Sequence, residues 1–357
     1  MSPVQRAGIL GIGTYLPEEV RRNDWWPTEV VEAWMSARRG PPPLPPAPTA
    51  GMARVIAAMT QQAYDPFQGV TERRVMPADM KSVDMEVRAA EQAIAMAGID
   101  REEIGAVLTH SAVPEYLLSN SASLLHHRLG LPADCFSMQA EASGFSFMMQ
   151  LGIAEQMIAL GRARHVLCTQ SCASSRLIDR NDPHSPLLGD GASAVIVGPV
   201  PEGGVLASVY RTDGALPRAL VASVPGGRWY DPGQVVLHRA DPGHAIQTFL
   251  ETADRAKEAV DAVLARLDLL PTQVDFFGAH QGTPWLRQVI QDVTGLTNAR
   301  AVDVFATTGY MVAVSIPLVL AIALREGQLR AGDLVVLFGG GVGSTYGASV
   351  LRWGDAR

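Results

Sequence analysis

The chain has 357 residues, of which 47% are apolar and 18% are charged, and its formal net charge is −7. This length and composition predict a folded protein with a large buried core and exclude a disordered one. The acidic balance argues against a nucleic-acid-binding protein, which needs a basic surface. No apolar run reaches the about 18 residues of a membrane-spanning helix.

The N-terminus and the cysteines indicate the compartment. The first residues, MSPVQRAGILGIGTYLP, lack the charged, apolar and cleavage regions of a signal peptide. Three cysteines, Cys135, Cys168 and Cys172, do not make a disulfide framework. His165 lies near two of them, but without a second ligand pair we interpret these residues as core and expect no metal. We therefore expect a cytoplasmic protein with reduced thiols.

Strands and helices alternate in the first half of the chain. The predicted strands are residues 4–13, 106–110, 165–171 and 192–200, and the predicted helices are residues 27–39, 84–97 and 119–129. Gly98 is expected to end the second of these helices, and Ser119 or Asn120 to cap the third. A longer apolar helix pattern opens at the small residues Ala140 to Gly144.

Residues 40–51, GPPPLPPAPTAG, interrupt this pattern. Proline fixes φ and donates no backbone hydrogen bond, so the stretch predicts a polyproline II spacer rather than a helix or a central strand. We interpret it as an inserted surface loop, and a partner-binding segment is the alternative.

The second half repeats the alternation. Strands are predicted at residues 203–211, 274–280 and 333–341, and helices at residues 243–266, 284–294 and 313–326. Alternating elements predict βαβ units and a mainly parallel sheet. Because both halves have similar contents, we expect a duplicated fold.

Two segments resemble catalytic loops but lack the required residues. GGGVGSTYG (339–347) has neither a P-loop lysine nor G-x-G-x-x-G spacing, and a strand pattern follows it. A glycine turn whose N–H groups approach a ligand fits it better. In EASGF (141–145), Glu141 and Phe145 occupy the glycine places of a serine-hydrolase elbow, so Ser143 is interpreted as a packing residue.

His280 ends the apolar strand VDFFGAH and precedes a turn. The carboxyl ends of buried strands are where α/β proteins place much of their chemistry, and an imidazole suits proton transfer. On these observations alone, a functional histidine and a packed histidine that closes the strand are equally favoured.

The order and spacing of several segments resemble the ketoacyl-acyl-carrier-protein synthase III family, which has the thiolase-like fold. The resemblance covers nearly the whole chain, and the Pro-rich stretch is an insertion in it. The segments that carry it are GIGTYLP (11–17), GVTERRV (69–75), EQAIAMAGID (91–100), ASGFSF (142–147), LLGDGASAVIV (187–197), AHQGT (279–283), SIPLVLAIAL (315–324) and LFGGGVGSTYGA (337–348). No single segment is decisive, but their order is specific.

The resemblance implies an α/β protein whose two similar halves, placed here at residues 1–199 and 200–357, pack into five layers (αβαβα). It also implies an obligate homodimer. The family's cysteine stands at a helix N-terminus, where the helix dipole lowers the pKa of a thiol. That cysteine accepts an acyl group from CoA or acyl carrier protein, and a histidine and an asparagine assist the second substrate. No cofactor besides the thioester substrate is implied.

The family residues are carried over one by one. The segment Ala-Cys-small-Gly-Phe corresponds to residues 141–145, which puts the nucleophile at Ala142. His280 matches the family histidine, and Tyr310 stands in the place of the asparagine, five residues before Ser-Ile-Pro. The backbone N–H groups of Ala142 and Gly341 are the candidate oxyanion donors.

Two of these positions depart from the family. Ala142 cannot be a nucleophile, and we expect that it replaces a cysteine by design, so that the chain is an inactivated form. A natural loss in a non-catalytic partner subunit is the alternative. Tyr310 argues against decarboxylative chain extension, which needs the histidine and asparagine together. A cysteine and His280 suffice for acyl transfer, and Tyr310 would contact His280 or line the acceptor pocket.

The resemblance also implies contacts with CoA or its pantetheine arm. Arg73 and Arg74 match the family's Glu-Arg-Arg segment and are candidates for phosphate contacts, with a structural ion pair as the alternative. Trp25, Trp26 and Trp34 lie where the family has its adenine-stacking tryptophan, and Trp34 is our candidate.

These inferences predict an acyltransferase or condensing enzyme of the synthase III type in secondary-metabolite or polyketide biosynthesis. Its partners would be acyl-CoA or acyl carrier protein and a small-molecule acceptor, with no nucleic acid and no membrane. The alternatives are a non-catalytic partner subunit of a heteromeric condensing enzyme and a synthase that initiates fatty-acid synthesis.

Overall fold

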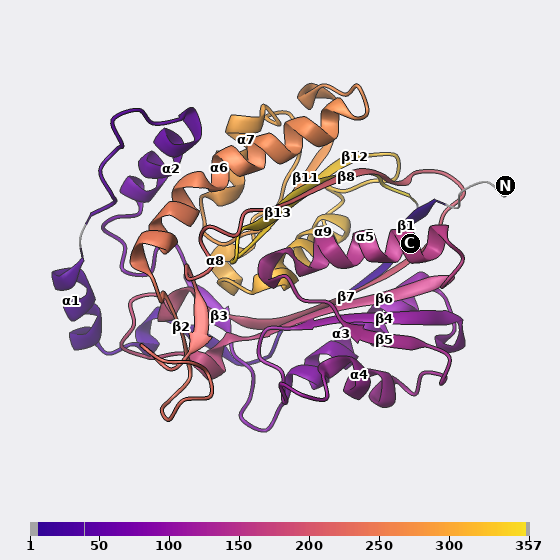
Figure 1. Cartoon of the computed structure of the whole chain (residues 1–357), viewed down its shortest axis with the longest axis horizontal. Helices are drawn as coiled ribbons and strands as arrows, with labels where there is room; N and C mark the ends of the chain where they lie inside the picture. Colours follow the sequence, from indigo (N-terminus) through magenta and orange to yellow (C-terminus); the bar gives the residue numbers. More distant parts are fainter. Residues whose placement is uncertain (1–5, 39, 355–357) are drawn as a thin grey trace.

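Two β-sheets lie on either side of a central pair of helices, and further helices cover the outer faces of both sheets (Figure 1). The computed structural model describes residues 6–38 and 40–354. The central pair is α5 (Ser146–Ala159) and α9 (Ser315–Arg325), and the outer helices are α3 (Ser82–Ala97) and α4 (Ser121–Leu129) on one side and α6 (Pro242–Ala265) and α7 (Leu286–Thr294) on the other. These are the five layers that the sequence predicts.

The first sheet has the strand order β1-β7-β6-β4-β5. Its members are β1 (Ala7–Tyr15), β4 (Ile104–Ser111), β5 (Phe136–Gln139), β6 (His165–Ala173) and β7 (Asp190–Pro199). The second sheet has the order β11-β12-β13-β8. Its members are β8 (Gly204–Thr212), β11 (Phe276–Ala279), β12 (Leu334–Gly341) and β13 (Thr345–Arg352).

The expectation of a mainly parallel sheet is wrong, because both sheets are mixed. Strand β4 runs parallel to β5 and β6, and β11 runs parallel to β12, but the other four pairings are antiparallel. Parallel neighbours need a long crossover, usually an α-helix. Residues 174–189 hold only short 3-10 turns, and residues 342–344 form a tight turn, so β7 and β13 return antiparallel to their predecessors.

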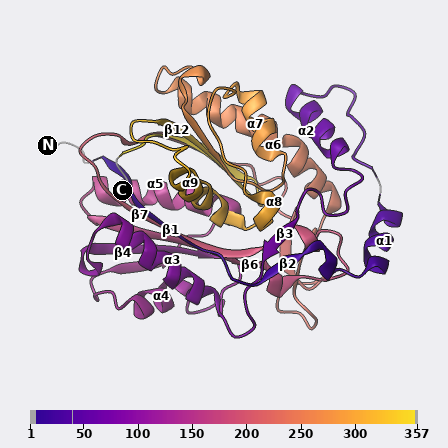
Figure 2. The ribbon, with the colours of Figure 1, turned by 180° about the vertical axis from the view of Figure 1, so that it is seen from behind.

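The central helices are buried because their sequences are apolar almost all round, as expected for a helix between two sheets. Side chains of α5 and α9 share one core cluster with strands of both sheets, whereas the outer helices pack in separate clusters. Figure 2 shows α3 and α4 on the outer face of the first sheet from the opposite side.

Several element boundaries differ from the predictions. Strand β5 occupies residues 136–139, so the central helix begins only after it, with a 3-10 turn at Ser143–Phe145. Asn120, rather than Ser119, caps α4 by accepting a hydrogen bond from the Ala122 N–H, and Gly98 ends α3 with φ +64° as expected. Residues 4 and 5 of the first predicted strand lie outside the described residues.

The Pro-rich stretch contains no helix or strand from residue 40 to 49. The predicted range is two residues too long, because α2 (Ala50–Gln61) begins inside it, capped by the Thr49 hydroxyl. This helix packs against α6 and α7, as both views show (Figures 1 and 2). The Thr49 hydroxyl also donates to Asp254 of α6.

Smaller elements complete the fold. They are α1 (Thr28–Ala37), α8 (Phe305–Thr308), the paired strands β2 (Val20–Arg22) and β3 (Glu72–Arg74), and the paired strands β9 (Val221–Ser223) and β10 (Val236–His238).

Candidate active site

The two central helices begin with the same backbone conformation. Ala142 has φ −151° and ψ 37°, Ser143 has φ +52°, and a 3-10 turn then leads into α5. In the second half Met311 has φ −120° and ψ 32°, Val312 has φ +51°, and a 3-10 turn leads into α9. A positive φ is costly for serine and more so for β-branched valine, and such strain concentrates at functional sites. Ala142 therefore lies at a sharp turn that the fold repeats.

A serine holds each of the two turns. The Ser146 hydroxyl accepts a hydrogen bond from the Ala142 N–H (2.8 Å) and donates to the Ser143 carbonyl (2.7 Å). In the second half the Ser315 hydroxyl donates to the Val312 carbonyl (3.2 Å) and lies 3.1 Å from Nδ1 of His280. The second turn thus extends its serine to the histidine.

His280 follows β11 directly, and its backbone N–H donates to the Phe338 carbonyl of β12. Because the Ser315 hydroxyl donates its own hydrogen to a carbonyl, its oxygen can accept a hydrogen bond from Nδ1–H of His280, and this network assigns the Nδ1–H tautomer. Burial lowers the pKa of His280 from its ordinary 6.5 to about 4, and a backbone contact to Val312 opposes this only in part. At neutral pH the ring is uncharged, and its Nε2 lone pair is free to accept a proton.

The histidine meets the first turn at Gly144. A Cβ atom added to Gly144 would lie 3.0 Å from Nε2 of His280 and 2.5 Å from the Gly340 carbonyl oxygen. Contacts that short exclude a side chain, so glycine lets the ring approach the start of α5. His280, predicted from the sequence, is therefore brought next to the Ala142 turn.

Gly341 packs on the same turn from the other side. A Cβ atom there would lie 2.4 Å from the Ala142 carbonyl oxygen and 3.3 Å from the Gly144 nitrogen. One expectation needs correction: the Ala142 N–H is donated to Ser146, so in this conformation it is not available as an oxyanion donor. Gly341 lies beside the Ala142 turn, and its role as an oxyanion donor stays a prediction.

Tyr310 stands edge-on to His280, with ring centroids 5.5 Å apart and an interplanar angle of 87°. Its backbone is held by Leu187, whose carbonyl accepts from the Tyr310 N–H at 2.6 Å. Burial raises the pKa of the phenol, and the nearby Ser143 side chain opposes this rise only in part. The hydroxyl therefore stays protonated and cannot serve as a base near neutral pH.

The cysteines do not replace the missing nucleophile. Cys135, Cys168 and Cys172 are all buried. Burial raises the pKa of the Cys172 thiol to about 12 and that of the Cys135 thiol to about 11, and it also raises the pKa of Cys168. Protonated thiols are poor nucleophiles. Among the residues that the structure describes, no three His, Cys, Asp or Glu side chains gather as a metal site.

A cavity of about 190 Å³ opens between His280 and the N-terminal half of α6. Tyr310, Gly340 and Gly341 line it near the histidine. Its apolar wall is formed by Leu187, Leu188, Leu220, Leu237, Leu286 and Phe338. The histidine thus faces a space in which a substrate with an apolar part can bind.

The residues predicted to contact CoA are placed differently from the expectation. Arg73 is 1% exposed and donates to Pro186 and Asn23, and Trp34 is 7% exposed and donates to the Asn181 carbonyl. Both side chains are therefore committed to internal contacts, and neither lines the cavity beside His280. Arg74 is half-buried and donates to the Pro17 carbonyl.

Trp25 is the tryptophan of the three whose ring reaches solvent, with 37% exposure. The guanidinium carbons of Arg21 and Arg180 lie 3.8 and 4.6 Å from its ring centroid. Sequence reasoning missed both arginines. Arg21 stands four residues before Trp25, which was a usable signal, but Arg180 comes from a distant loop and had none.

Comparisons with known proteins agree with this geometry. The family model for 3-oxoacyl-[acyl-carrier-protein] synthase III matches residues 136–214, and the model for its C-terminal part matches residues 264–353. A β-ketoacyl-[acyl-carrier-protein] synthase III from Clostridioides difficile (strain 630) is 28% identical over 98% of both chains.

Solved structures show the same likeness. A 3-oxoacyl-(acyl carrier protein) synthase III from Pseudomonas aeruginosa PAO1 has 26% identity and a TM-score of 0.77, covering 98% of this chain and 99% of that one. The Thermus thermophilus enzyme has 26% identity and a TM-score of 0.78, covering 97% and 99%. Fold and site together define a thiolase-like condensing enzyme. Over nearly its whole length the chain is similar to proteins of the ketoacyl-acyl-carrier-protein synthase III family.

Within the described parts of the chain, no helix is both long enough and apolar enough to cross a membrane.

Proposed function

We propose that this fold transfers an acyl group from an acyl-CoA or acyl carrier protein thioester to a small-molecule acceptor by way of a cysteine at position 142. The observation that carries the proposal is the neutral His280 ring, which packs against the start of α5 and faces the cavity. A base that is uncharged at neutral pH can take a proton from a thiol or an acceptor.

The reaction needs two steps with one proton carrier. In the first, the thiol at position 142 loses its proton to His280 Nε2 and its sulfur bonds to the acyl carbon of the donor. The donor's carbon–sulfur bond breaks, and the released thiolate takes the proton back. In the second step, His280 removes a proton from the acceptor, and the acceptor atom bonds to the acyl carbon. The carbon–sulfur bond to the cysteine breaks, and the cysteine thiolate takes the proton from His280, which restores the thiol.

Tyr310 favours simple acyl transfer over chain extension by decarboxylation. Decarboxylation produces an enolate, which needs hydrogen-bond donors aimed at its oxygen. The Tyr310 ring stands edge-on to the histidine instead, in the place where the family has its asparagine amide. The proposal therefore places the enzyme in secondary-metabolite or polyketide biosynthesis, with fatty-acid initiation as the alternative.

In this proposal the present chain is the form whose nucleophile has been replaced by alanine. It would bind the donor without forming a thioester. The second candidate is a non-catalytic partner subunit, which the alanine itself favours if it is natural. Trp25, whose ring is exposed and flanked by two arginines, replaces Trp34 as the proposed contact for the adenine of CoA.

We also propose that the protein is a homodimer and that it is located in the cytoplasm. The homodimer is supported by three consecutive exposed apolar residues after β4, Tyr116, Leu117 and Leu118, which are 59%, 66% and 89% exposed. A contiguous apolar segment of this kind is typical of a protein–protein contact.

Intact-protein mass spectrometry tests the proposal. The Ala142→Cys variant, incubated with a panel of acyl-CoAs, is expected to gain the mass of one acyl group, and the Ala142 chain is expected to gain none. Adding Ser143→Ala to the variant is the matched control, because the neighbouring hydroxyl must not account for the gain. If no donor acylates the Ala142→Cys variant, the acyltransferase is ruled out and the partner subunit is favoured.

A further inference from the structure

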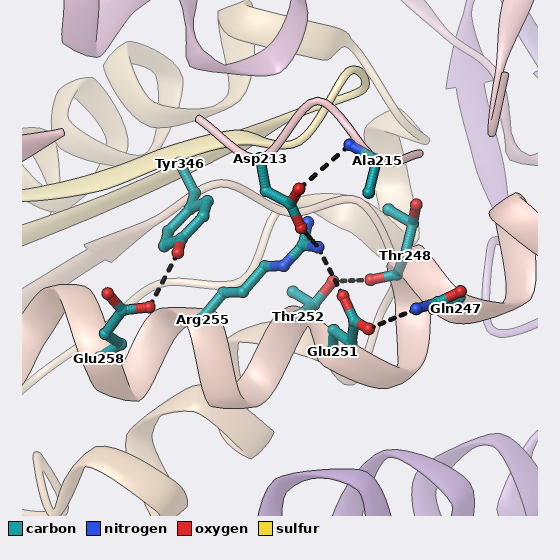
Figure 3. A network of polar contacts seen from close by, with 9 residues as sticks. All are labelled: Asp213, Ala215, Gln247, Thr248, Glu251, Thr252, Arg255, Glu258 and Tyr346. Atoms are coloured by element: carbon teal, nitrogen blue, oxygen red, sulfur yellow. Dashed lines mark hydrogen bonds and ion pairs between the residues drawn. The ribbon is translucent and has the colours of Figure 1, made fainter. Parts of the chain in front are cut away.

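The cavity beside His280 has a second, polar end against α6. There it is lined by Thr248, Thr252 and Arg255 of the helix and by Ser344 and Thr345 at the start of β13. Figure 3 shows the three α6 side chains on one side of the helix, with Arg255 reaching toward Asp213. The apolar wall and the histidine line other parts of the same cavity. A molecule that fills the cavity would therefore present different groups to its two ends.

Arg255 cannot supply a free positive charge to a ligand. Its Nη2 lies 2.5 Å from Glu251 and 3.0 Å from Asp213, and its side chain is 12% exposed. Glu251 also accepts from Gln247, as Figure 3 shows. Two carboxylates thus surround one guanidinium, and an added anion would meet net repulsion.

The neighbouring charged pair does not offset the negative balance around Arg255. Tyr346, which lines the cavity, donates its hydroxyl to Glu258 at 2.8 Å (Figure 3). Arg211 lies 3.4 Å from Glu258, so that pair is neutral overall. Glu251, Asp213 and Glu258 thus stand against Arg255 and Arg211, so carboxylates outnumber arginines by one around this end. Asp182 and Arg239, which also line the cavity, carry opposite charges that interact with each other. The local charge disfavours a carboxylate ligand and tolerates a neutral or cationic one.

Two hydroxyl groups at this end have no partner. Among the residues that the structure describes, the Ser344 and Thr248 hydroxyl oxygens are buried and make no hydrogen bond. Ser344 is 3% exposed and is held at φ +59°, where serine is uncommon. Buried hydroxyls are nearly always hydrogen-bonded, and each exception needs an explanation. A ligand that carries its own hydroxyl groups would give each of these two hydroxyls a hydrogen-bond partner.

We propose that this polar end binds the acceptor of the acyl transfer, and that the acceptor is a neutral, polyhydroxylated molecule with an apolar portion, of the kind a glycoside represents. This inference rests on the proposed function. One acceptor hydroxyl lies at His280 and gives its proton to Nε2 while its oxygen bonds to the acyl carbon. The carbon–sulfur bond of the thioester breaks, and the proton passes to the released thiolate.

Binding to the Ala142 chain as it exists tests the inference without requiring catalysis. The probes are phenyl β-D-glucopyranoside and phenyl β-D-glucuronide, which share a scaffold and differ by one carboxylate. Saturation-transfer NMR is expected to show binding of the glucoside, with the glucuronide at least about tenfold weaker because of the excess carboxylates. Glu251→Gln should narrow this difference, since it removes one of the negative charges at Arg255.

Matched variants locate the site. Thr248→Val and Ser344→Ala are each expected to weaken glucoside binding about 3- to 10-fold, the loss of one hydrogen bond. Thr248→Ser keeps the hydroxyl and should retain most of the affinity. Thr60→Val, on the exposed face of α2, is the control that should leave binding unchanged.

The proposed acceptor class and the proposed acyltransferase activity can be contradicted independently of each other. If the glucuronide binds as well as the glucoside, or if neither binds, the acceptor class is overturned even when the Ala142→Cys variant becomes acylated. If the glucoside binds with the expected variant pattern and no donor acylates the Ala142→Cys variant, the binding site stands and the acyltransferase does not.

Discussion

The two turns that open the central helices share a backbone but have different tasks. In the first half, Ser146 binds only its own turn, through the Ala142 N–H and the Ser143 carbonyl. In the second half, Ser315 occupies the equivalent place, four residues after the first residue of the turn, and reaches His280 as well. In the proposed reaction, one copy of the turn presents position 142 and the other orients His280 as the base. The comparison teaches that a duplicated fold can divide one active site between its copies.

The largest expected effect comes from removing the base that the second turn holds. His280→Ala in the Ala142→Cys background should slow acyl transfer about 100- to 10,000-fold, the usual contribution of a positioned acid–base group. Transfer rates from an acyl-CoA, with the folded state checked by circular dichroism, would measure it. A loss below about threefold would separate the histidine from the chemistry and leave it as a packing residue.

A second test exchanges the small residues at the equivalent third position of the two turns, Gly144 and Ala313. Gly144→Ala would place a Cβ atom 2.5 Å from the Gly340 carbonyl oxygen, so we expect a loss of about 1–3 kcal/mol in the free energy of unfolding. Ala313→Gly introduces no atom that needs space and should lower the free energy of unfolding by about 1 kcal/mol or less. Urea denaturation of both variants would compare them, and equal losses would contradict the asymmetry of the two turns.

The pH dependence of the free energy of unfolding tests whether His280, which the second turn holds, is neutral in the folded protein. Burial lowers the pKa of His280 from 6.5 to about 4, so the unfolded chain takes up a proton below pH 6.5 that the folded chain refuses. The contribution of the neutral ring is therefore present above pH 6.5 and is lost as the pH falls toward 4.

His280→Gln removes this contribution and leaves in place the other buried titratable side chains, such as His110 of β4 and Glu86 of α3, which are 2% and 0% exposed. The difference in unfolding free energy between parent and variant should shrink as the pH falls from 7 to about 4. Denaturation curves across this range would measure it. A difference that stays constant would show that the ring is not held neutral in the folded protein.

The smallest effect on the transfer rate is expected from substituting the serines of the two turns, Ser315 and Ser146. In the Ala142→Cys background, Ser315→Ala removes one hydrogen bond to His280 and should slow acceptor transfer about 3- to 10-fold. Because Ser315 positions the ring, the variant should also shift the pH at which the transfer rate falls. Ser146→Ala is the matched variant in the other turn and should leave that pH unchanged. The same shift in both variants would remove the distinction between the serines.

Much of the fold could be predicted from sequence, because periodic apolar segments fix the elements and their order carries the resemblance. The site was predicted in part: His280 ends a strand, and the structure brings it to the Ala142 turn with Gly341. The role of Ser315 could not be predicted, because it depends on a positive φ at Val312 that no residue type signals.

Other expectations failed because tertiary contacts decided them. Arg73 and Trp34 have the residue types of a CoA site, but only the packing of distant loops shows that both are buried. The mixed sheets depended on whether the long segment between β6 and β7 contains a helix, which its Pro- and Asp-rich sequence, SSRLIDRNDPHSP, left undecided. Helix α2 was not predicted because the prolines immediately before it indicated a loop.

The Pro-rich segment before α2 offers a place to modify the protein from outside. Residues 40–49 contain no helix or strand, and Leu44 within them is 51% exposed. The helix that follows is anchored to the back of α6 through Thr49 and Asp254, and α6 forms the polar end of the cavity. A fluorescent dye attached at position 44 would therefore lie outside the cavity, on a segment that is connected to α6 through Thr49. Such a dye could report ligand binding without occupying the substrate site.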